Sequence, residues 1–341
     1  MKTLVTGANG LLGSNLVREL IKRGHHVRVL IRQGADLTTL NGLDVEYCYG
    51  DLLDEQGLRQ ACQGCDFIIH SGGKTAGCQT KFSDFAEINI KGTQNIVMAA
   101  ENAGVTRMVH VSSNCVFGGG TLENPGSELS EFNGFRFNSG YINSKYLAQQ
   151  WVLSEIEKKR FPIVIVNPTI MIGPYDARPS SGEIILRILS QQFQLCPLGG
   201  KNFIDVRDAA TATCNALTMG IPGECYLLAS ENITFAGFFE KVNRIYGRSG
   251  LRILIPGGLL KCAGLMGNAI QALTSQDIPL NLVNTRQLTN ESYFSAEKAV
   301  RTLDLPQRPI DFAIRDAIAW FVANNYLQPN LLPEVPVPAV A

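Results

Sequence analysis

The stretch TLVTGANGLLGSNL, residues 3–16, places three glycines at every third position directly after the apolar run that begins the chain. In a strand, turn and helix of this kind, Gly7 allows a tight turn, Gly10 lets the backbone approach a pyrophosphate, and Gly13 lets the helix pack on the sheet. The N-terminus of the helix then faces the phosphates. The spacing and its context predict a dinucleotide site, with further backbone contacts from Asn9, Leu11 and Leu12.

Outward from this turn, short β-branched apolar runs alternate with amphipathic stretches. Helical patterns cover residues 12–24 and 86–104. The predicted strands are TLVTG (3–7), HVRVLIR (26–32), VEYCYGD (45–51), DFIIHSG (66–72), RMVHVSS (107–113) and IVIVNP (163–168). Strands separated by helices indicate right-handed βαβ units and a parallel sheet covered on both faces. The sequence therefore predicts an α/β protein with a doubly wound sheet.

Charge and apolar patterning restrict the partners. Lysine plus arginine equals aspartate plus glutamate at 30 each in 341 residues, so net charge gives no argument for nucleic acid or an anionic membrane. Met1 runs directly into a strand-like segment, which leaves no room for a secretory signal. The apolar window at 251–273 is interrupted by Arg252, Pro256 and Lys261, which makes it a poor membrane span. We expect a cytoplasmic protein that takes a small-molecule substrate and binds no nucleic acid.

Nine cysteines scattered through apolar contexts indicate reduced thiols and no disulfide framework. Cys62 and Cys65 form a CxxC, but no second CxxC or histidine pair completes a metal-ligand set. We therefore expect no metal site.

The end of the second strand decides between the two nicotinamide dinucleotides. An acidic side chain there would hold a ribose 2′-hydroxyl, whereas an arginine accepts a 2′-phosphate. Arg32 stands at this position and indicates NADP, through its planar guanidinium. Asp36 could still reach a ribose, so NAD stays open. Asp51, beside Leu52 after the third strand, is placed to accept from the adenine amino group or to cap the following helix.

Several motifs in order carry a resemblance to a known family. TGANGLLG (6–13), YGDL (49–52), NIKGTQNI (89–96), VSSNCVFG (111–118) and YINSK (141–145) resemble the extended short-chain dehydrogenase/reductase superfamily, and NPTIMIGP, FIDVRDAA and FSAEKAVRTLDL extend the likeness to nearly the whole chain. Within it the chain resembles the dihydroflavonol 4-reductase and 3β-hydroxysteroid dehydrogenase-like branch. Residues 167–185 are most similar to bacterial proteins labelled hopanoid-associated sugar epimerases, a label that fixes no substrate.

The resemblance implies that Ser113, Tyr141 and Lys145 are the catalytic residues. Reducing a carbonyl requires a proton on oxygen as hydride reaches carbon, and a phenol with an ordinary pKa of about 10 is a weak base for the reverse step. An ammonium four residues later on the same helix face is expected to lower that pKa. Lys145 would also hold the nicotinamide ribose, and Ser113 would polarise the substrate oxygen. Ser112 is the alternative serine, but counting back from VFG favours Ser113.

Other positions follow from the same resemblance. Asn89 matches a helix asparagine, for which a packing or water-binding role is as consistent as a catalytic one. Backbone approach to the cofactor is expected after the fourth strand, at His70, Ser71, Gly72 and Gly73. Asn167 begins the segment expected to line the nicotinamide pocket, although a strand end joining two lobes is equally compatible. The cofactor contacts expected in that segment are Pro168, Thr169 and Ile170.

The resemblance also implies two lobes. Residues 1–166 and 203–229 would form the Rossmann domain, residues 167–202 and 230–327 the substrate lobe, and residues 328–341 a disordered tail. Two amphipathic helices, near 82–103 and 141–156, would pair with a second copy in a homodimer.

Three functions stay open. Few basic residues between 173 and 203 and an apolar segment after 250 favour an NADP-dependent reductase or dehydrogenase of a lipophilic or aromatic carbonyl or alcohol. The second is a sugar-nucleotide epimerase or dehydratase that holds NAD. The third is a non-catalytic NADP-sensing module, which has no evident need for all three catalytic residues.

Overall fold

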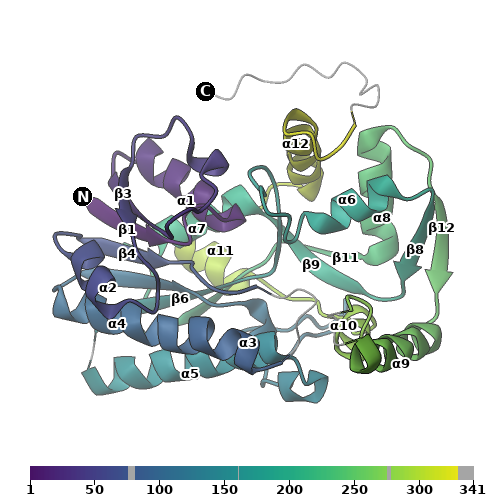
Figure 1. Ribbon diagram of the computed structural model, residues 1–341, viewed down its shortest axis with the longest axis horizontal. Helices are drawn as coiled ribbons and strands as arrows, with labels where there is room; N and C mark the ends of the chain where they lie inside the picture. The colour runs from purple at the N-terminus through teal and green to yellow at the C-terminus, as the bar shows by residue number, and fades with distance from the viewer. Residues whose placement is uncertain (76–80, 160, 275–277, 329–341) are drawn as a thin grey trace.

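A computed structural model describes residues 1–75, 81–159, 161–274 and 278–328. Its central sheet has seven parallel strands in the order β10-β6-β5-β4-β1-β2-β3 (Figure 1). The strands are β1 (Lys2–Thr6), β2 (His26–Ile31), β3 (Glu46–Tyr49), β4 (Phe67–His70), β5 (Arg107–Val111), β6 (Ile163–Pro168) and β10 (Cys225–Leu228). The predicted doubly wound α/β fold is confirmed, with its strand order reversing between β1 and β4.

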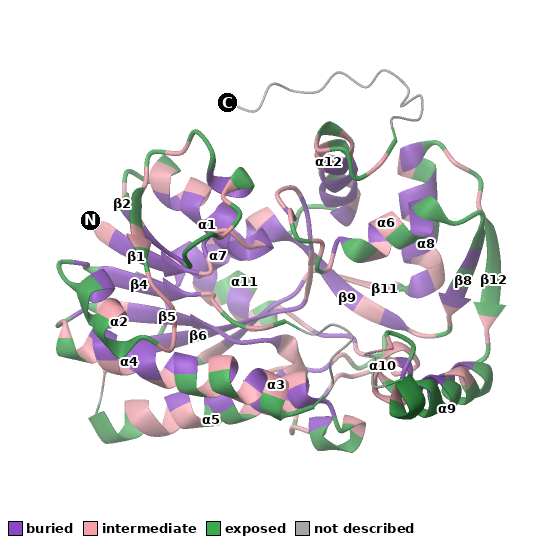
Figure 2. Cartoon of the chain, viewed as in Figure 1, coloured by how far each residue is buried: buried purple, intermediate pink, exposed green. Residues whose placement is uncertain are grey.

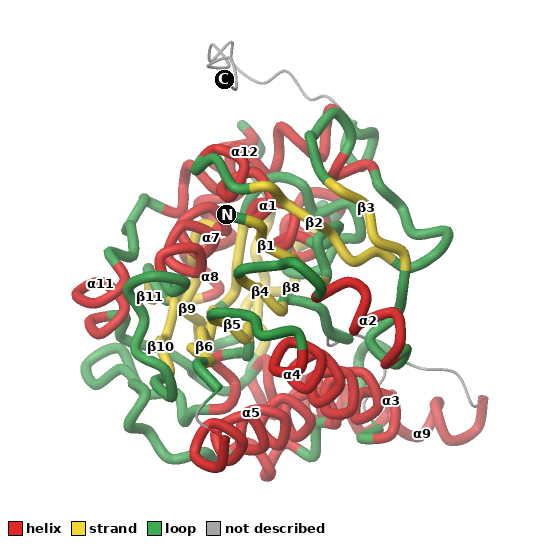
Figure 3. Tube along the Cα trace, turned by 90° about the vertical axis from the view of Figure 1, so that its left-hand side faces the viewer, coloured by secondary structure: helices red, strands yellow, loops and turns green. Residues whose placement is uncertain are grey.

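Helices cover both faces of this sheet, as the end-on view in Figure 3 shows. On one face, α1 (Leu11–Lys22) packs against α7 (Val206–Asn215). The other face carries α2 (Glu55–Cys62), α4 (Gly92–Asn102) and α5 (Gly140–Lys159). Successive residues of a strand point to opposite faces of the sheet. Val5 and Val109 pack in the core on the α1 side, whereas Leu4 and Met108 pack in the core on the α4 side. Burial on both faces explains why these strands read as continuous apolar runs.

The helix before β5 contains a wider turn. Residues Ser83–Ala86 form α3, Glu87–Lys91 form a π-helical turn, and α4 follows without a break. Asn89, at the centre of the π turn, is buried. Such turns inside α-helices are often found at functional sites.

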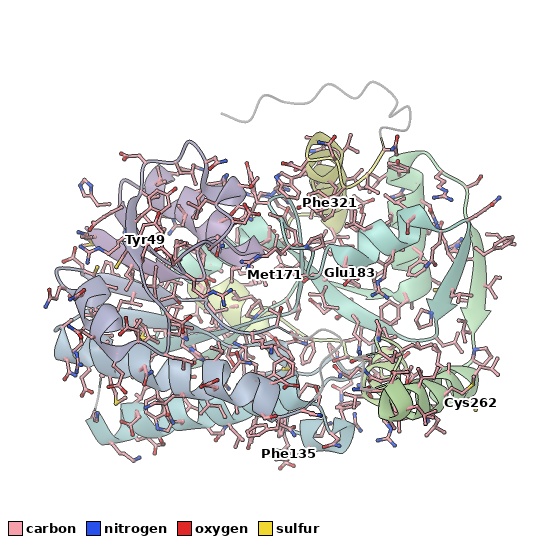
Figure 4. All side chains as sticks on the ribbon, in the orientation of Figure 1. Tyr49, Phe135, Met171, Glu183, Cys262 and Phe321 are labelled. Atoms are coloured by element: carbon pink, nitrogen blue, oxygen red, sulfur yellow. The ribbon has the colours of Figure 1, made fainter. Side chains whose placement is uncertain are left out.

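A second lobe is built around smaller sheets. Its three-stranded sheet joins β7 (Ile170–Ile172), β9 (Gly200–Asp205) and β11 (Glu231–Thr234), and a two-stranded sheet pairs β8 (Phe193–Pro197) with β12 (Leu251–Ile255). Its core is formed with α6 (Glu183–Ser190), α8 (Phe235–Tyr246) and α12 (Ile310–Ala323). Figure 4 shows Phe321 of α12 in this lobe. Helices α9 (Gly257–Thr274) and α10 (Leu282–Leu288) pack together at its lower edge.

The two lobes are joined by several crossings of the chain. Only Thr169 separates β6 from β7. Helix α11 (Glu297–Leu303) returns to pack on β10 and α7. At the junction, Arg207 pairs with the buried Asp205 at 2.6 Å and with Asp316 of α12 at 2.6 Å.

The remaining elements are short 3₁₀ turns at Thr38–Leu40, Asn114–Val116 and Gly134–Phe137. The predicted tail, residues 328–341, lies outside the described residues except for Gln328. Among the helices of the described ranges, none combines the length and apolarity needed to cross a membrane.

Candidate active site

The glycine turn between β1 and α1 leaves no room for side chains. Gly7 has a φ of +67°, and a Cβ there would lie 2.7 Å from the Gly72 Cα. A Cβ on Gly13 would lie 2.1 Å from the Gly7 carbonyl oxygen. Gly10 is the N-cap of α1, and within the described chain no side chain caps this helix end. The turn therefore presents backbone N–H groups and a bare helix N-terminus, which fits a dinucleotide pyrophosphate.

The turn after β2 is tied to the glycine loop. Asn9 donates to the Asp36 carbonyl oxygen at 2.9 Å and accepts from the Thr39 hydroxyl. The Asp36 carboxylate accepts from the Thr38 hydroxyl and N–H, and these bonds lower its pKa. Arg32 is exposed directly after β2. Thr38 contacts one oxygen of the Asp36 carboxylate, Oδ1, through both bonds.

Asp51 and Leu52 follow β3. The Asp51 carboxylate accepts from the Leu53 N–H at 2.9 Å. The N-cap of α2 is Asp54, which accepts from the Gln56 and Gly57 N–H groups. The alternative role for Asp51 as a helix cap is therefore wrong, because the helix begins one turn later. Leu52 packs against the backbone of Gly72 and Gly92.

Residues 71–73 run alongside the glycine turn. Ser71 donates to the Thr6 carbonyl oxygen at 2.7 Å, and the Gly72 N–H donates to the Thr6 hydroxyl. A Cβ on Gly73 would lie 3.1 Å from the Asn89 Oδ1 and 3.8 Å from the Lys145 Nζ. This segment thus connects the nucleotide turn with the predicted catalytic helix.

Ser113, Tyr141 and Lys145 converge at the carboxyl end of β5. Ser113 follows the strand, whereas Tyr141 and Lys145 lie on the first turns of α5. The Ser113 hydroxyl lies close enough to the Tyr141 phenol to lower its pKa, and the Lys145 Nζ donates to the Val111 carbonyl oxygen at 3.1 Å. The Tyr141 ring meets Phe85 edge to face at 6.0 Å. Ser112 has a buried hydroxyl without a partner in the described structure, so the alternative serine does not share this contact.

Burial sets the protonation states of these groups. It raises the pKa of the Tyr141 phenol, and the hydrogen bond from Ser113 only partly opposes this shift. Burial lowers the pKa of Lys145 to about 8. The expected lowering of the phenol pKa by Lys145 is not seen: desolvation and the neighbouring Cys115 thiol both raise that pKa. Tyr141 is therefore a protonated phenol at neutral pH.

Asn89 connects this site to residue 74. Its Oδ1 accepts from the Lys74 N–H at 2.8 Å, and its Nδ2 donates to the Lys74 carbonyl oxygen and to the Ser144 hydroxyl at 3.0 Å. With three partners already in the protein, Asn89 holds the 73–74 segment against α5.

His70 and His110 stack beneath the site with ring centroids 5.5 Å apart. His70 contacts the hydroxyls of Thr6 and Thr93 at 2.7 and 3.1 Å. Both nitrogens of His110 lack a hydrogen-bond partner within the described residues. Burial lowers the pKa of His70 to about 3 and that of His110 well below its ordinary value, so both are neutral.

Asn167, Pro168 and Thr169 lie where the lobes join. Asn167 donates to the Ser113 carbonyl oxygen at 3.0 Å and to Gln149 at 2.8 Å. The Thr169 hydroxyl donates to Asn202 of β9 at 2.8 Å. Ile170 opens β7. The bond from Thr169 to Asn202 links the two lobes. The bond from Asn167 holds the backbone of Ser113 in place.

A pocket of about 550 Å³ lies beside the N-terminus of α5. It is bounded by Gly140, by residues 81–82 and by α9 and α10, and several of its walls are carboxamides: Asn138, Asn143, Asn268, Gln271 and Asn281. Because Gly140 directly precedes Tyr141, this pocket is the candidate entrance for substrate.

Sequence reasoning missed a contact between α1 and the segment after β7. Arg18 donates to the carbonyl oxygens of Ser14 and Thr39, and its guanidinium lies 3.5 Å from the centre of the Tyr175 ring. Tyr175 has a positive φ of 74°. The sequence did show Arg18 on the helix after the glycine turn. It could not show that this arginine contacts Tyr175, because the two residues are 157 positions apart in the chain.

Comparison with known proteins gives consistent results. The profile described as the NAD dependent epimerase/dehydratase family matches residues 3–229. A putative dihydroflavonol 4-reductase of Synechocystis sp. is 32% identical over 95% of both chains. Sterol demethylase protein B of Methylococcus capsulatus is 31% identical over 94% of this chain and 98% of its own. The crystal structure of gox2253 superposes with a TM-score of 0.84 at 31% identity, covering 96% of this chain and 99% of that one.

Proposed function

The chain belongs to the NAD-dependent epimerase/dehydratase family and is an NAD(P)-dependent oxidoreductase of the extended short-chain type, and we propose that it uses NADP to reduce a lipophilic or aromatic carbonyl or to oxidise the corresponding secondary alcohol. The observation that carries this proposal is the convergence of Ser113, Tyr141 and Lys145 with the phenol held protonated.

In the proposed reaction, Tyr141 acts as the general acid. A bound NADPH would supply hydride to the carbonyl carbon. Tyr141 donates its proton to the carbonyl oxygen, so ketone, hydride and proton give the secondary alcohol, and the phenol regains a proton from solvent. Ser113 donates a hydrogen bond to the same oxygen and favours its developing negative charge. Because burial keeps the phenol protonated at neutral pH, Tyr141 has the proton that the reductive direction requires.

Lys145 and the glycine turn are proposed to hold the cofactor. Lys145 would bind the nicotinamide ribose hydroxyls through its ammonium, and Arg32 would pair with the 2′-phosphate. Gly7, Gly10 and Gly13 would admit the pyrophosphate. The other proposed contacts are Asn9, Leu11, Leu12, Asp51, Leu52, Ser71, Gly72, Gly73, Asn89, Pro168, Thr169 and Ile170.

The charges of the second lobe support an uncharged, lipophilic substrate. Arg187 pairs with Glu183 at 2.8 Å on the surface. The Lys201 Nζ donates to the Gln287 and Asn290 carbonyl oxygens at 2.9 and 2.7 Å. Both cations therefore have partners within the protein, although the exposed Arg187–Glu183 pair is weak. The names of two relatives, a dihydroflavonol reductase and a sterol demethylase protein, support the same class of substrate.

A second candidate is a sugar-nucleotide epimerase or dehydratase with bound NAD. It is favoured by a surface pocket of about 320 Å³ that is bordered by Arg136, Lys261 and Arg286, a group of cations that suits a diphosphate. The carboxamides of the larger pocket also suit a polyhydroxylated substrate. A non-catalytic NADP sensor is the third alternative.

The first experiment identifies the nucleotide released from denatured, freshly purified protein and then titrates the emptied protein with NADPH and NADH. We expect tighter binding of NADPH. Stoichiometric NAD that resists dialysis would instead support the epimerase or dehydratase.

The second experiment compares Tyr141→Phe with Tyr146→Phe on a panel of ketones and aldehydes. Tyr146 lies on the same helix and stacks on Phe132 at 3.8 Å, so its substitution controls for loss of a phenol from α5. We expect Tyr141→Phe to bind NADPH normally and to lose about a thousandfold in kcat. Wild-type turnover by Tyr141→Phe would refute the proposed acid, and activity on any carbonyl would exclude the sensor.

The proposal includes a homodimer formed through α4 and α5, and a cytoplasmic location. Light scattering at micromolar concentration tests the assembly, and a monomer mass would contradict it.

A further inference from the structure

Helix α9 turns its apolar side chains outward. Leu273 is 87% exposed and Met266 66% exposed. Side chains three and four residues apart share a helix face, and the exposed face of α9 is formed by Leu259, Cys262, Leu265, Met266, Ala269, Ile270 and Leu273. Figure 2 shows the exposed surface of this helix, and Figure 4 shows Cys262 at its outer side. A helix that is apolar all round is normally buried, so this face is expected to have an occupant.

The inner face of α9 fixes this orientation. A Cβ on Gly264 would lie 2.4 Å from the Thr285 Oγ1, and one on Gly267 would lie 1.8 Å from the Leu280 carbonyl oxygen. Only glycine fits against α10 at these two positions. The helix therefore cannot rotate its leucines inward without a clash.

The adjacent two-stranded sheet extends the apolar surface. In the β8–β12 pairing, Leu251 lies beside Phe193 and Ile253 beside Leu195. All four side chains are exposed. β12 leads into α9 through Pro256, so the strand and the helix adjoin at one corner of the lobe (Figure 1).

Several cations border this surface. Residues 247–274 contain Arg248, Arg252 and Lys261, and Arg252 pairs with Glu240 of α8 at 3.3 Å. Lys261 lies on the flank of α9 and, with Arg136 and Arg286, borders the 320 Å³ pocket. Within the described residues, neither Lys261 nor Arg286 forms an ion pair with a carboxylate. An apolar helix face flanked by cations is typical of helices that lie in the headgroup region of anionic bilayers.

A second copy of the chain fits this surface poorly. A two-fold contact would bring the same patch of both copies together. Lys261 and Arg286 would then approach their own equivalents. Glu240, a described carboxylate beside β12, is already paired with Arg252 at 3.3 Å.

We propose that α9, with the β8–β12 face beside it, docks in the surface plane of an anionic phospholipid bilayer. The outward side chains enter the acyl boundary, and Lys261, Arg136 and Arg286 contact lipid phosphates. Since α9 also borders the pocket at the N-terminus of α5, docking would bring the substrate entrance to the bilayer. This last consequence rests on the proposed function, whereas the docking itself does not.

Vesicle flotation tests the docking directly, using the full chain and vesicles of phosphatidylcholine with or without phosphatidylglycerol. We expect binding to the anionic vesicles that weakens as salt is raised. Met266→Gln with Leu273→Gln should reduce binding at least tenfold, whereas Leu129→Gln, at a leucine that is 93% exposed elsewhere, should not. Lys261→Gln should reduce it roughly fivefold, whereas Lys22→Gln, which removes the same charge from the end of α1, should not.

A thiol-reactive, polarity-sensitive dye provides a second readout. Attached at Cys262 and located by peptide mass, it should shift to the blue with anionic vesicles. No shift and no flotation would overturn the proposal, as would equal losses from Leu129→Gln and from the Met266 and Leu273 variant. If those α9 changes instead lower the molecular mass without vesicles, the occupant is a second copy. Displacement of the protein from vesicles by inorganic pyrophosphate at constant ionic strength would assign the cation pocket to a soluble diphosphate and also overturn it. NADPH binding and carbonyl reduction are measured separately, so failure of docking leaves the proposed function intact.

Discussion

Glycine has different structural roles in the turn before α1 and in helix α9. In the first, Gly7 and Gly13 bring backbone segments together, and the apolar side chains that follow, such as Leu16, are buried in the core of the nucleotide lobe. In α9, Gly264 and Gly267 let the helix pack tightly beside α10, and Leu259, Leu265 and Leu273 on its opposite face are exposed. The first region stabilises the fold, whereas the second contributes a surface. Substitutions in the two regions should therefore have opposite consequences for stability and for association.

The largest expected contrast comes from truncating one leucine in each helix. Leu16 is fully buried in α1 and Leu273 is exposed in α9. Leu16→Ala should lower the free energy of unfolding by about 3 kcal/mol, because it leaves a cavity. Leu273→Ala should change it by less than about 0.5 kcal/mol. Urea unfolding followed by circular dichroism measures both, and comparable losses would mean that α9 packs its outer face on this chain.

A smaller contrast is expected from adding one methyl group to a glycine in each region. Gly13→Ala places a Cβ 2.1 Å from the Gly7 carbonyl oxygen, and it should cost about 2 kcal/mol and weaken NADPH binding. Gly258→Ala, near the start of α9, meets no atom within 4 Å and should be neutral or slightly stabilising, because alanine favours helix. The same unfolding experiment, with an NADPH titration, tests the pair. Normal NADPH affinity in Gly13→Ala would contradict the proposal that this turn binds the cofactor.

The smallest effect concerns the pH dependence of stability. Burial lowers the pKa of His110 well below 6.5. As pH falls below about 6.5, His110 is therefore protonated in the unfolded chain but stays neutral in the folded chain. Folding stability is therefore present above this pH and is lost as pH falls, by up to about 1.4 kcal/mol per pH unit for each such histidine. His110→Phe should remove one histidine's share of that slope. Free energies of unfolding measured between about pH 7 and pH 5 check this, and parallel curves for the two proteins would contradict it.

The first six strands of the nucleotide sheet could be predicted from sequence because each is a short apolar run between helical patterns. The glycine turn indicated the nucleotide site in the same way, since its spacing is local, whereas Ser113, Tyr141 and Lys145 followed from the family resemblance. The sequence left Asp51 as a possible N-cap of α2, whereas the structure has Asp54 there. The two positions differ by one helical turn, and a local sequence pattern does not fix the start of a helix that closely.

Other features depended on distant parts of the chain. The protonation of Tyr141 follows from burial by the assembled site, whereas the sequence showed only an ammonium four residues away. The pairing of Arg18 with Tyr175 joins two lobes. From sequence, the apolar segment at 251–273 indicated only a lipophilic substrate and a poor membrane span. Only the inward glycines at 264 and 267 show which side of the helix faces out.

The chain order of the central sheet has a consequence for synthesis. β6 is buried along its whole length, but its outer neighbour β10 begins only at Cys225, after the chain has passed through β7, α6, β8, β9 and α7. While these residues are being made on the ribosome, β6 presents an unpaired apolar edge, the kind of edge that promotes aggregation. We therefore expect aggregation of the nascent protein to be most favoured between the synthesis of β6 and that of Leu228, when the sheet can close.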